Sequence, residues 1–425
     1  MKERIFTPKT IEKTFDFAVI GGGLAGTMAA IAAAREGLDV ILIERFGCLG
    51  GMATSGLIFP FMRDTEKGSE LPVNAGLYSE MKRRTHELGG MKTPEGKMYR
   101  EEYMKIALDR MVAETGRIRV LYNAKLFDAE RENDRIVSVT VATVSGNIKI
   151  RASLFADATG NADLVAFSGL PYEQGRESDG LCQPVTLCFR FGNVDKDRFD
   201  KKIANQVYLD LKAQGKIRNP REDVLVFNYQ VPGILHMNTT RVFGIDPCDV
   251  EQMSAAETEL REQEYEMYLM MRKYVPGMEN CELIGSSVLA GIRESRRIVG
   301  LSRIEKDDIV GVRKFGDSIA RGAYKIDIHN PGGSGTEILE IRPNDYYTIP
   351  YSALIPRDAS NLIAPGRAVS SAHEALSAIR VMPITTCMGE AAGTAAGLAL
   401  RGGCAFRDVN TDELREKLVC YGALV

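Results

Sequence analysis

The stretch DFAVIGGGLAGTMAAIAAAREGLDVILIE, residues 16–44, has the pattern of one uninterrupted strand–turn–helix–strand unit. Two short apolar runs flank an alanine-rich segment, which predicts two parallel strands joined by a helix. Gly21, Gly23 and Gly26 occupy the three glycine positions of G-x-G-x-x-G. The first glycine permits a tight turn, the second lets the backbone approach a pyrophosphate, and the third lets helix and strand pack closely. This unit predicts a dinucleotide-binding fold.

An acidic residue, Glu44, ends the second expected strand. A carboxylate at this position accepts hydrogen bonds from the ribose hydroxyls of a dinucleotide, whose phosphates sit at the positive end of the helix. The alternative interpretation is a glycine-rich turn that binds no ligand. Because strand, turn, helix and acid occur together in the expected order, the sequence favours dinucleotide binding.

Composition sets the class of the protein. The chain has 425 residues, 44% of them hydrophobic and 26% charged, and a formal net charge of −3. These values are typical of a soluble globular protein of one to three domains, without the basic field that nucleic acid or acidic membranes require. The polar start of the chain lacks the apolar run of a signal peptide, and no stretch approaches the ~20 apolar residues of a membrane span. Eight cysteines without C-x-x-C spacing, beside four histidines, predict reduced thiols in a cytoplasmic protein without a zinc cluster.

After the opening unit, the spacing of apolar residues is first typical of a helix and then of strands. Residues 99–115 have apolar positions at helical spacing. From residue 118 the period changes to two, which predicts one strand and then a β-meander. The expected strands cover residues 118–122, 124–130, 135–144 and 147–151. A separate apolar strand, Leu154–Ala158, is expected next.

The middle of the chain lacks the strand–helix alternation of its start. Strands are expected at 187–192, 224–230 and 241–245, together with one long helix, Ser254–Tyr274. The helix opens with Ser254 and Glu257, which have the spacing of a capping box.

The last part of the chain returns to the first pattern. Strands are expected within 337–351 and at Asn361–Pro365, and a final helix at Pro383–Arg401. We therefore expect an α/β fold with a discontinuous Rossmann-like FAD-binding domain, a parallel sheet plus the meander, formed by residues 1–169 and 336–425. An α+β substrate domain, residues 170–335, is inserted between them.

Three separated stretches favour FAD over NAD. They are the Gly50-Gly51 extension of the opening unit, FADATG at 155–160, and NLIAPGR at 361–367, which is followed by AIRVMP at 378–383. FAD is an extended ligand whose adenosine, pyrophosphate, ribityl and ring parts need separate backbone approaches. Domains that bind NAD usually lack both the meander and the returning strand and helix. The sequence therefore predicts FAD.

On these motifs the chain resembles FAD-dependent oxidoreductases with a glutathione-reductase-type flavin fold. Within that group it is most similar to the family related to the flavoprotein subunits of succinate dehydrogenase and fumarate reductase. The residues that carry the resemblance are GGGLAG (21–26), ERFGCLGGMATSG (44–56), DATGNAD (157–163), GIRESRRIVG (291–300) and APGR…SAHEALSAIRVMP…MGEAAGTAAGLAL (364–400).

The resemblance implies a set of cofactor-binding residues. These are Gly21, Gly23, Leu24, Ala25, Gly26, Glu44, Arg45, Gly50, Gly51, Leu126, Ala158, Thr159, Gly160, Gly366, Arg367, Val381 and Met382. The helix that begins at Met382-Pro383 is expected to point its N-terminus at the flavin ring. Proline suits the first helical position, and the helix dipole stabilises the negative charge of a reduced flavin.

Departures from the related families narrow the chemistry. Cys48 stands alone, with Ala53 in the position where disulfide reductases carry a second cysteine, so disulfide exchange is not expected. No histidine lies between Arg45 and Arg84, which predicts non-covalent FAD. The glycine cluster Gly332–Gly335 neither leaves a strand nor opens a helix, so a second dinucleotide site and direct use of NAD(P)H are not expected.

Two arginines are candidates for binding the substrate. Arg293 lies in the charged run RESRR, and the resemblance favours a role in holding a carboxylate or another oxygen-rich group, because guanidinium groups match carboxylates. The alternative for this run is a helix with a Glu294–Arg297 pair on a solvated face. Arg380 stands immediately before the helix that faces the flavin.

Two histidines are candidate general bases. His329 follows an expected strand, and His373 lies just past the GR motif. Each has a structural alternative, as a hydrogen-bond donor that only holds a loop. His86 and His236 have no such context.

The expected reaction transfers a hydride between a small oxygen-rich substrate and FAD. His329 or His373 removes the adjacent proton, and Arg293 and Arg380 hold the substrate oxygens. The electron acceptor is unknown. Two other function classes are a non-catalytic FAD-fold binding protein and an RNA-modifying flavoprotein. The chain keeps the flavin-facing motifs, against the first, and disperses its basic residues among acids, against the second.

Overall fold

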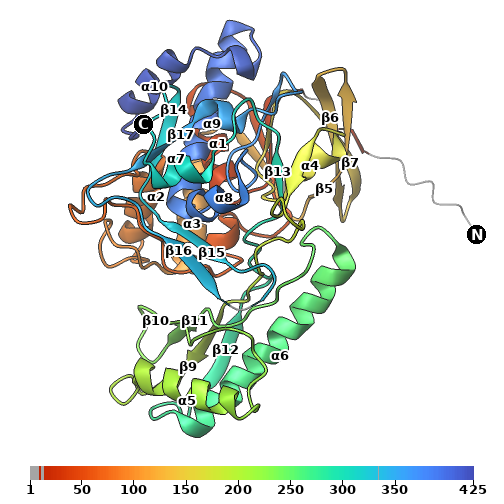
Figure 1. Cartoon of the computed structure of the whole chain (residues 1–425). Helices are drawn as coiled ribbons and strands as arrows, with labels where there is room; N and C mark the ends of the chain where they lie inside the picture. Colours follow the sequence, from red (N-terminus) through yellow and green to blue (C-terminus); the bar gives the residue numbers. More distant parts are fainter. Residues whose placement is uncertain (1–8, 11–13, 334) are drawn as a thin grey trace, which may run out of the picture.

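The computed structural model describes residues 9–10, 14–333 and 335–425 (Figure 1). Most of the polar start of the chain and Ser334 of the glycine cluster therefore lie outside the described residues. The fold is mixed α/β and is organised around an eight-stranded sheet of order β4-β3-β2-β7-β6-β5, to which β1 and β18 pair at β7. Its strands are β1 (Lys9–Thr10), β2 (Phe15–Ile20), β3 (Val40–Ile43), β4 (Ile118–Leu121), β5 (Lys125–Glu132), β6 (Arg135–Thr143), β7 (Gly146–Asp157) and β18 (Leu362–Ile363).

Strand β7 joins two kinds of pairing in one sheet. Its first half pairs antiparallel with β6 in the meander, and its second half pairs parallel with β2 and β18. The expectation of two strands, 147–151 and 154–158, is therefore wrong. Both halves have ladder partners, so the chain has no reason to turn between them. The buried strands β2 and β3 have the apolar runs typical of a parallel sheet covered on both faces.

Helices α1 (Leu24–Arg35) and α9 (Met382–Gly402) pack against each other at unusually close range. An added Cβ on Gly389 would lie 2.1 Å from the carbonyl oxygen of Ala25, and one on Gly393 would lie 2.1 Å from that of Ala29. Any larger side chain at either glycine would push the helices apart. The small alanine and glycine side chains thus allow the close contact, and this contact fixes where α9 begins relative to the first turn of α1.

Helix α9 differs in two details from its expected form. It begins at Met382, so Pro383 occupies its second position. It is also not the last helix, because α10 (Thr411–Cys420) follows it. The other helices packed near the main sheet are α2 (Leu77–Glu87), α3 (Glu101–Glu114), α4 (Asp163–Phe167), α7 (Lys306–Val310) and α8 (His373–Ile379).

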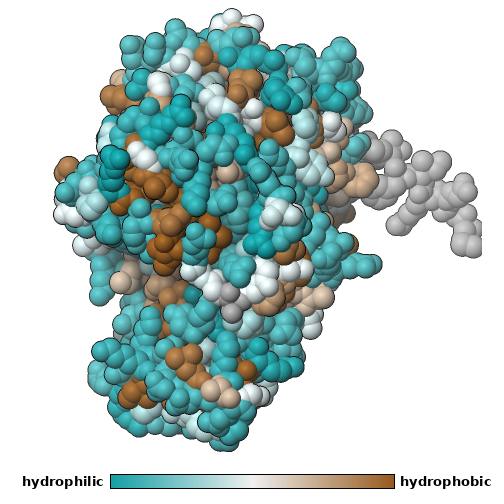
Figure 2. Space-filling view, viewed as in Figure 1, coloured by the Kyte–Doolittle hydropathy of each residue, from teal (hydrophilic) through white to brown (hydrophobic). Residues whose placement is uncertain are grey.

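A second, antiparallel sheet lies apart from the first, in the lower part of Figure 1. It has the order β10-β11-β9-β12 and is covered by two helices. The elements are β9 (Phe189–Gly192), β10 (Val226–Asn228), β11 (Leu235–Met237), β12 (Glu282–Ser286), α5 (Lys201–Ala213) and α6 (Val250–Tyr274). Figure 2 shows a largely hydrophilic surface on this part, and a larger hydrophobic cluster near the centre of the upper part.

Three sequence expectations for this region are wrong. Residues 241–245 form no strand, since Val242 makes only an isolated bridge. Helix α6 starts four residues before Ser254, because the Asp249 side chain accepts hydrogen bonds from the N–H groups of Glu251 and Gln252. The Ser254 hydroxyl instead donates to the Val250 carbonyl, 2.6 Å away.

Two strand pairs connect the expected substrate part to the C-terminal part. Strand β14 (Ser318–Gly322) pairs with β17 (Tyr347–Pro350), and β15 (Ile326–His329) pairs with β16 (Thr336–Leu339). A third pair joins β8 (Tyr172–Gln174) to β13 (Arg296–Ile298). The division into two domains at residues 169 and 335 stays a prediction. Among the helices of the described residues, none has the length and apolar character needed to cross a membrane.

One buried carboxylate on α9 couples stability to pH. Glu390 is 2% exposed, and its Oε2 accepts a hydrogen bond from the N–H of Leu77 at the start of α2, 2.9 Å away. Burial raises its pKa to about 7. Since the pKa is higher in the folded state, the stability contributed by the protonated form is complete below the ordinary pKa of 4.5. It is lost as the pH rises through about 7.

We expect Glu390→Gln to remove this pH dependence. The amide oxygen still accepts from Leu77 but carries no charge to bury. The free energy of unfolding should rise by about 1–3 kcal/mol at pH 8 and change little at pH 5. Urea unfolding of the apoprotein at both pH values measures this, with the exposed Glu416→Gln as control. An equal gain at both pH values, or a loss at pH 8, would contradict the assignment.

Candidate functional site

Two adjoining cavities lie where the sequence motifs meet. The first follows the carboxyl ends of β2 and β7, the usual ligand position in a parallel sheet. It is lined by all of the expected cofactor residues except Gly26 and Val381. Its further lining residues are Ile20, Ile43, Phe46, Met52, Ala53, Ala124, Lys125, Asn161, Asp163, Leu289, Ala290, Ile292, Pro365, Arg380 and Thr385. Their contact with FAD remains a prediction.

The glycine turn forms a cradle. It packs closely against the protein at Gly21 and Gly26 and faces open space at Gly23. Gly21 has a φ of +102°, and an added Cβ would lie 2.4 Å from the carbonyl oxygen of Ala158. An added Cβ on Gly26 would lie 1.8 Å from the carbonyl oxygen of Gly21, so Gly26 serves the packing of helix on strand. On Gly23, by contrast, it would meet no atom within 4 Å. The turn therefore exposes its backbone to open space where a pyrophosphate would approach.

A second glycine loop lies on the first. The N–H of Gly50 donates to the carbonyl oxygen of Gly22 (2.8 Å), and an added Cβ on Gly51 would lie 2.9 Å from the Cα of Gly23. Side chains at these positions would fill the cradle. Both loops thus fit the phosphates of a dinucleotide.

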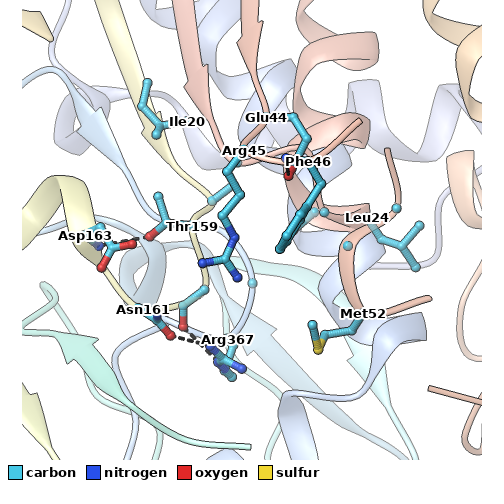
Figure 3. A pocket seen from close by; sticks show the side chains of 18 of the residues that line it. Ile20, Leu24, Glu44, Arg45, Phe46, Met52, Thr159, Asn161, Asp163 and Arg367 are labelled. Atoms are coloured by element: carbon cyan, nitrogen blue, oxygen red, sulfur yellow. Dashed lines mark hydrogen bonds between the residues drawn. The ribbon is translucent and has the colours of Figure 1, made fainter. Parts of the chain in front are cut away.

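Glu44 is held at the rim of the first cavity by backbone donors. Its Oε2 accepts from the N–H of Gly22 (2.7 Å) and its Oε1 from the N–H of Phe46 (2.8 Å). Burial raises its pKa from the ordinary value. Each oxygen keeps a further lone pair for a ribose hydroxyl. Figure 3 shows Arg45 beside it, extending into the pocket between Phe46 and Thr159.

A buried carboxylate shapes the turn after β7. Asp157 accepts from the hydroxyl of Thr159 (2.7 Å), the N–H of Thr159 (3.1 Å) and the N–H of Val165 (2.9 Å). Burial raises its pKa to about 6. These bonds hold Ala158–Gly160 against the cavity.

Arg367 ties three distant segments together beside that turn. Its Nε donates to the carbonyl oxygen of Gly160 (2.8 Å) and its Nη2 to the Oδ1 of Asn161 (2.6 Å), while Nη1 donates to the carbonyl oxygen of Ile292 (Figure 3). Burial lowers its pKa to about 10. The guanidinium therefore fixes the shape of the cavity wall and stays positively charged near the expected phosphates.

The N-terminus of α9 lies at the junction of the two cavities. Met52, Ile292, Arg380 and Met382 line both of them. No side chain caps the helix start at Val381, so the first N–H groups of α9 keep their capacity to donate. A flavin ring that reached this junction would meet the positive end of a helix of 21 residues.

The second cavity has a volume of about 680 Å³ and a cationic wall. Its basic lining residues are Arg221, Arg293, Lys325 and Arg380, and His329 lies among them. Arg293 is buried, and its Nη1 donates to the carbonyl oxygen of Pro184 (2.7 Å). Burial, together with the charges of Arg380 and Arg221, lowers the pKa of Arg293 well below its ordinary value.

The arginines at the junction lack carboxylate partners within the described residues. There, no Asp or Glu oxygen lies within ion-pair distance of Arg293 or of Arg380, whose Nη2 donates only weakly to Gln183 Oε1 (3.4 Å). A buried and a half-buried cation without an ion-paired carboxylate among the described residues attract an anionic ligand, and guanidinium groups bind carboxylates in matched geometry.

The solvated-face interpretation of the charged run is wrong. Glu294 and Arg297 are 0% and 2% exposed in their side chains and pair with each other. Arg297 belongs to β13 and donates to the carbonyl oxygen of Gly175 (2.8 Å). These charges are buried because they satisfy one another.

His373 does not reach either cavity. Its Nδ1 lies 2.7 Å from Oε2 of the buried Glu294, and the residue begins helix α8. This position does not support the expectation that His373 acts on the substrate, which stays an untested prediction. Its pairing with Glu294 serves the packing behind the arginine wall.

His329 lines the second cavity, but its hydrogen bonds and protonation do not suit a general base. Its Nδ1 lies 2.8 Å from Nη2 of Arg241 and 3.2 Å from the hydroxyl of Thr336. Because a guanidinium only donates, we assign Nδ1 as the acceptor and the proton to Nε2. Burial and the charge of Arg293 hold its pKa far below the ordinary value. His329 is therefore a neutral hydrogen-bond donor, and the general-base expectation is not supported by this geometry.

Several residues of the second cavity had no signal in the sequence. Arg221, Tyr324 and Asp327 line it, and Arg241 stands behind His329. None of them belongs to a motif: Arg221, Arg241 and Tyr324 lie in irregular segments and Asp327 on β15, and only the packing of the chain brings them together.

The comparison with known families decides the class of the protein. Residues 16–418 match the model of the family described as FAD dependent oxidoreductase. The chain belongs to this family. It is therefore an FAD-dependent oxidoreductase, and the first cavity, with its open glycine cradle, suits that cofactor.

Individual relatives add little beyond the family. A stretch of 46 residues, 11% of the chain, is 46% identical to the NADH:acrylate oxidoreductase of Vibrio harveyi, and it spans only 5% of that protein. The flavin-dependent brominase Bmp2 is similar in structure, with a TM-score of 0.50 at 12% identity, over 95% of this chain and 83% of the other. A geranylgeranyl bacteriochlorophyll reductase-like protein of Thermoplasma acidophilum has a TM-score of 0.48 at 15% identity, over 98% and 85% of the two chains.

Proposed function

We propose that this oxidoreductase moves a hydride between a small, oxygen-rich anionic substrate in the second cavity and FAD bound non-covalently in the first. The observation that carries the proposal is a pair of arginines in the second cavity, the buried Arg293 and the half-buried Arg380. Arg293 and Arg380 lie beside the N-terminus of α9 and have no carboxylate partner among the described residues. A carboxylate on the substrate would supply the missing negative charge.

The residues of the first cavity would hold FAD in segments. The loops around Gly23 and Gly50 would take the pyrophosphate, Glu44 the ribose, and the start of α9 the ring end. When bound, FAD supplies the two-electron chemistry. The chain's own part is to bind the substrate anion through Arg293 and Arg380 and to donate a hydrogen bond from His329 Nε2.

Further aspects of this proposal rest on the sequence motifs. A discontinuous Rossmann-like domain is supported by the parallel pairing of β18 with β7 and by the packing of α9 on α1. The chain resembles the family of succinate dehydrogenase and fumarate reductase flavoproteins, whose dehydrogenases attach FAD covalently through a histidine near the first glycine-rich loop. The absence of a histidine between Arg45 and Arg84 departs from that pattern and supports non-covalent attachment. Because the eight cysteines are free thiols, we place the protein in the reducing cytoplasm. The electron acceptor stays unnamed.

We expect the purified protein to be yellow and to release its flavin completely on denaturation. A covalent bond would keep the flavin on the precipitated chain, whereas the interactions around Gly23 and Arg367 disappear on unfolding. Acid precipitation followed by an absorption spectrum of supernatant and pellet measures this. Flavin in the pellet would overturn non-covalent binding, and a colourless protein that cannot be reconstituted with FAD would overturn the cofactor site.

Substrate class is tested by reduction of the bound flavin. The holoprotein is mixed anaerobically with hydroxy acids, dicarboxylates and neutral sugars, and bleaching of the visible flavin band is recorded. The arginine wall predicts bleaching by an acid and none by the neutral sugars. A holoprotein that no acid bleaches, or that only sugars bleach, would contradict the proposed function.

A further inference from the structure

We propose that Asp327, rather than a histidine, exchanges the proton with the substrate in the second cavity. The inference rests on the proposed function. Asp327 lies on β15 and lines the cavity together with Arg293, Arg380 and His329. Its backbone N–H donates to the Ser377 hydroxyl (3.1 Å), which holds the strand against α8.

The three carboxylates of this cavity differ in their partners. Glu222 accepts from Arg241 Nη1 (2.6 Å), and Asp223 accepts from Arg221 Nε (3.3 Å). A carboxylate in a close ion pair is stabilised in its charged form and is a weak proton acceptor. Within the described residues, Asp327 has no Lys, Arg or His nitrogen at ion-pair distance. Of the three, it is the carboxylate most free to take a proton.

Tyr324 positions this carboxylate. Its hydroxyl donates to Oδ2 of Asp327 (2.8 Å), and Tyr324 also lines the second cavity. Burial raises the pKa of Tyr324 far above neutral, so the phenol keeps its proton and donates throughout the physiological range. One oxygen of Asp327 is thus held by the phenol, and Oδ1 has no donor among the described residues that competes with a substrate.

The groups around Asp327 divide the remaining tasks. Arg293 and Arg380 are the positive charges that face it, and they suit the binding of the substrate anion and of charge that develops beside it. His329, two residues further along the strand, already accepts from Arg241 at Nδ1. It can donate from Nε2 but not remove a proton. His329, expected as the general base, therefore serves to bind the substrate, and Asp327 serves as the base.

The proposed step balances as follows. In the direction of substrate oxidation, a C–H or O–H bond of the substrate breaks, its proton goes to the Asp327 carboxylate, and its electron pair becomes the second bond of the product. FAD held by the residues of the first cavity would be the oxidant, and it would supply the two-electron chemistry by taking the hydride of the neighbouring carbon. In the direction of reduction the same carboxylic acid returns the proton. Asp327 is then ready for the next turnover.

The decisive variant is Asp327→Asn in the holoprotein. The probe is the hydroxy acid or dicarboxylate that bleaches the wild-type flavin most rapidly, and malonate serves as an unreactive anion. We expect the rate of flavin bleaching to fall by at least about 100-fold, the typical minimum for loss of a general base or acid. FAD content, melting temperature and the affinity for malonate, measured from the shift of the flavin band, should stay as in the wild type.

Two further variants separate proton transfer from charge balance. Glu337→Gln, exposed on the partner strand of the same hairpin, should keep the wild-type rate. Tyr324→Phe removes the hydrogen bond that positions the carboxylate, so kcat should fall while FAD content and the affinity for malonate stay as in the wild type.

Three outcomes count against the inference. If Asp327→Asn keeps the wild-type rate at saturating probe and only raises KM, Asp327 is a counter-ion of the arginines and the inference is wrong. An unchanged kcat in Tyr324→Phe, or a loss of malonate affinity in place of kcat, removes the positioning role. If no acid bleaches even the wild-type flavin, the proposed function itself fails, and this inference fails with it.

Discussion

Replacing Gly23 by aspartate is expected to abolish FAD binding and to leave the fold intact. Gly23 has φ −62° and ψ 176°, a conformation that any residue adopts, and an added Cβ would meet no protein atom within 4 Å. The side chain would therefore project into the space that the pyrophosphate needs. Two like charges about 4 Å apart repel by about 4 kcal/mol near a protein surface. One such pair corresponds to a loss of about 1000-fold in affinity.

This substitution has a matched control in the same chain. Gly316 is exposed, has open space around its added Cβ and lies far from both cavities, so Gly316→Asp should bind FAD as the wild type does. Flavin retained after gel filtration with excess FAD gives the binding, and thermal unfolding of the apoproteins gives the stability. A Gly23→Asp protein that keeps a full complement of FAD would show that the pyrophosphate does not lie at this turn.

Replacing Arg293 by methionine is expected to lower kcat/KM strongly and yet to stabilise the apoprotein. Arg293 is buried, its partner is a single carbonyl oxygen, and Arg380 and Arg221 repel it. Replacing such a charge by an apolar side chain of similar length removes the cost of desolvation, which is typically about 1–4 kcal/mol for buried ionic groups. The same change removes a charged donor to the substrate, worth about 1.5–3 kcal/mol or up to about 150-fold in kcat/KM.

Opposite effects on stability and turnover make this variant informative. Melting temperature of the apoprotein and anaerobic bleaching by the best acid are measured on the same preparation. Arg357→Met, an exposed arginine paired only with its neighbour Asp358, should change neither. If Arg293→Met unfolds at lower temperature and keeps the wild-type rate, Arg293 is a structural residue and the substrate anion binds elsewhere.

The cofactor half of the site was predictable because its signals are local. The turn at 21–26, the acid Glu44 and the DATG turn can each be recognised from a short stretch of sequence. All three line the first cavity. Glycines are placed there by φ angles and close contacts that few other residues tolerate. Such constraints are visible without knowledge of tertiary structure.

The substrate half was only partly predictable for the opposite reason. Arg293 and Arg380 were found through motifs, but Arg221, in an irregular segment, and Asp327, on β15, belong to no motif and meet only through packing. The structure gives His373 no place in either cavity lining, because proximity to a motif in sequence does not tell which way a helix turns its side chains. The buried pairing of Glu294 with Arg297 was likewise hidden, since helical spacing and a β-strand can place the same two residues in contact.

The close contact between α1 and α9 has a consequence for the life of the chain in the cell. Residue 24 opens one helix and residue 382 the other, yet both helix starts border the same cavity. A nascent chain that has emerged only as far as the meander holds the phosphate cradle but not Gly366, Arg380 or Met382. The cofactor therefore cannot be fully enclosed until synthesis is almost complete. Until then α9 does not cover the apolar face of α1, and this face is open to chaperones and to aggregation.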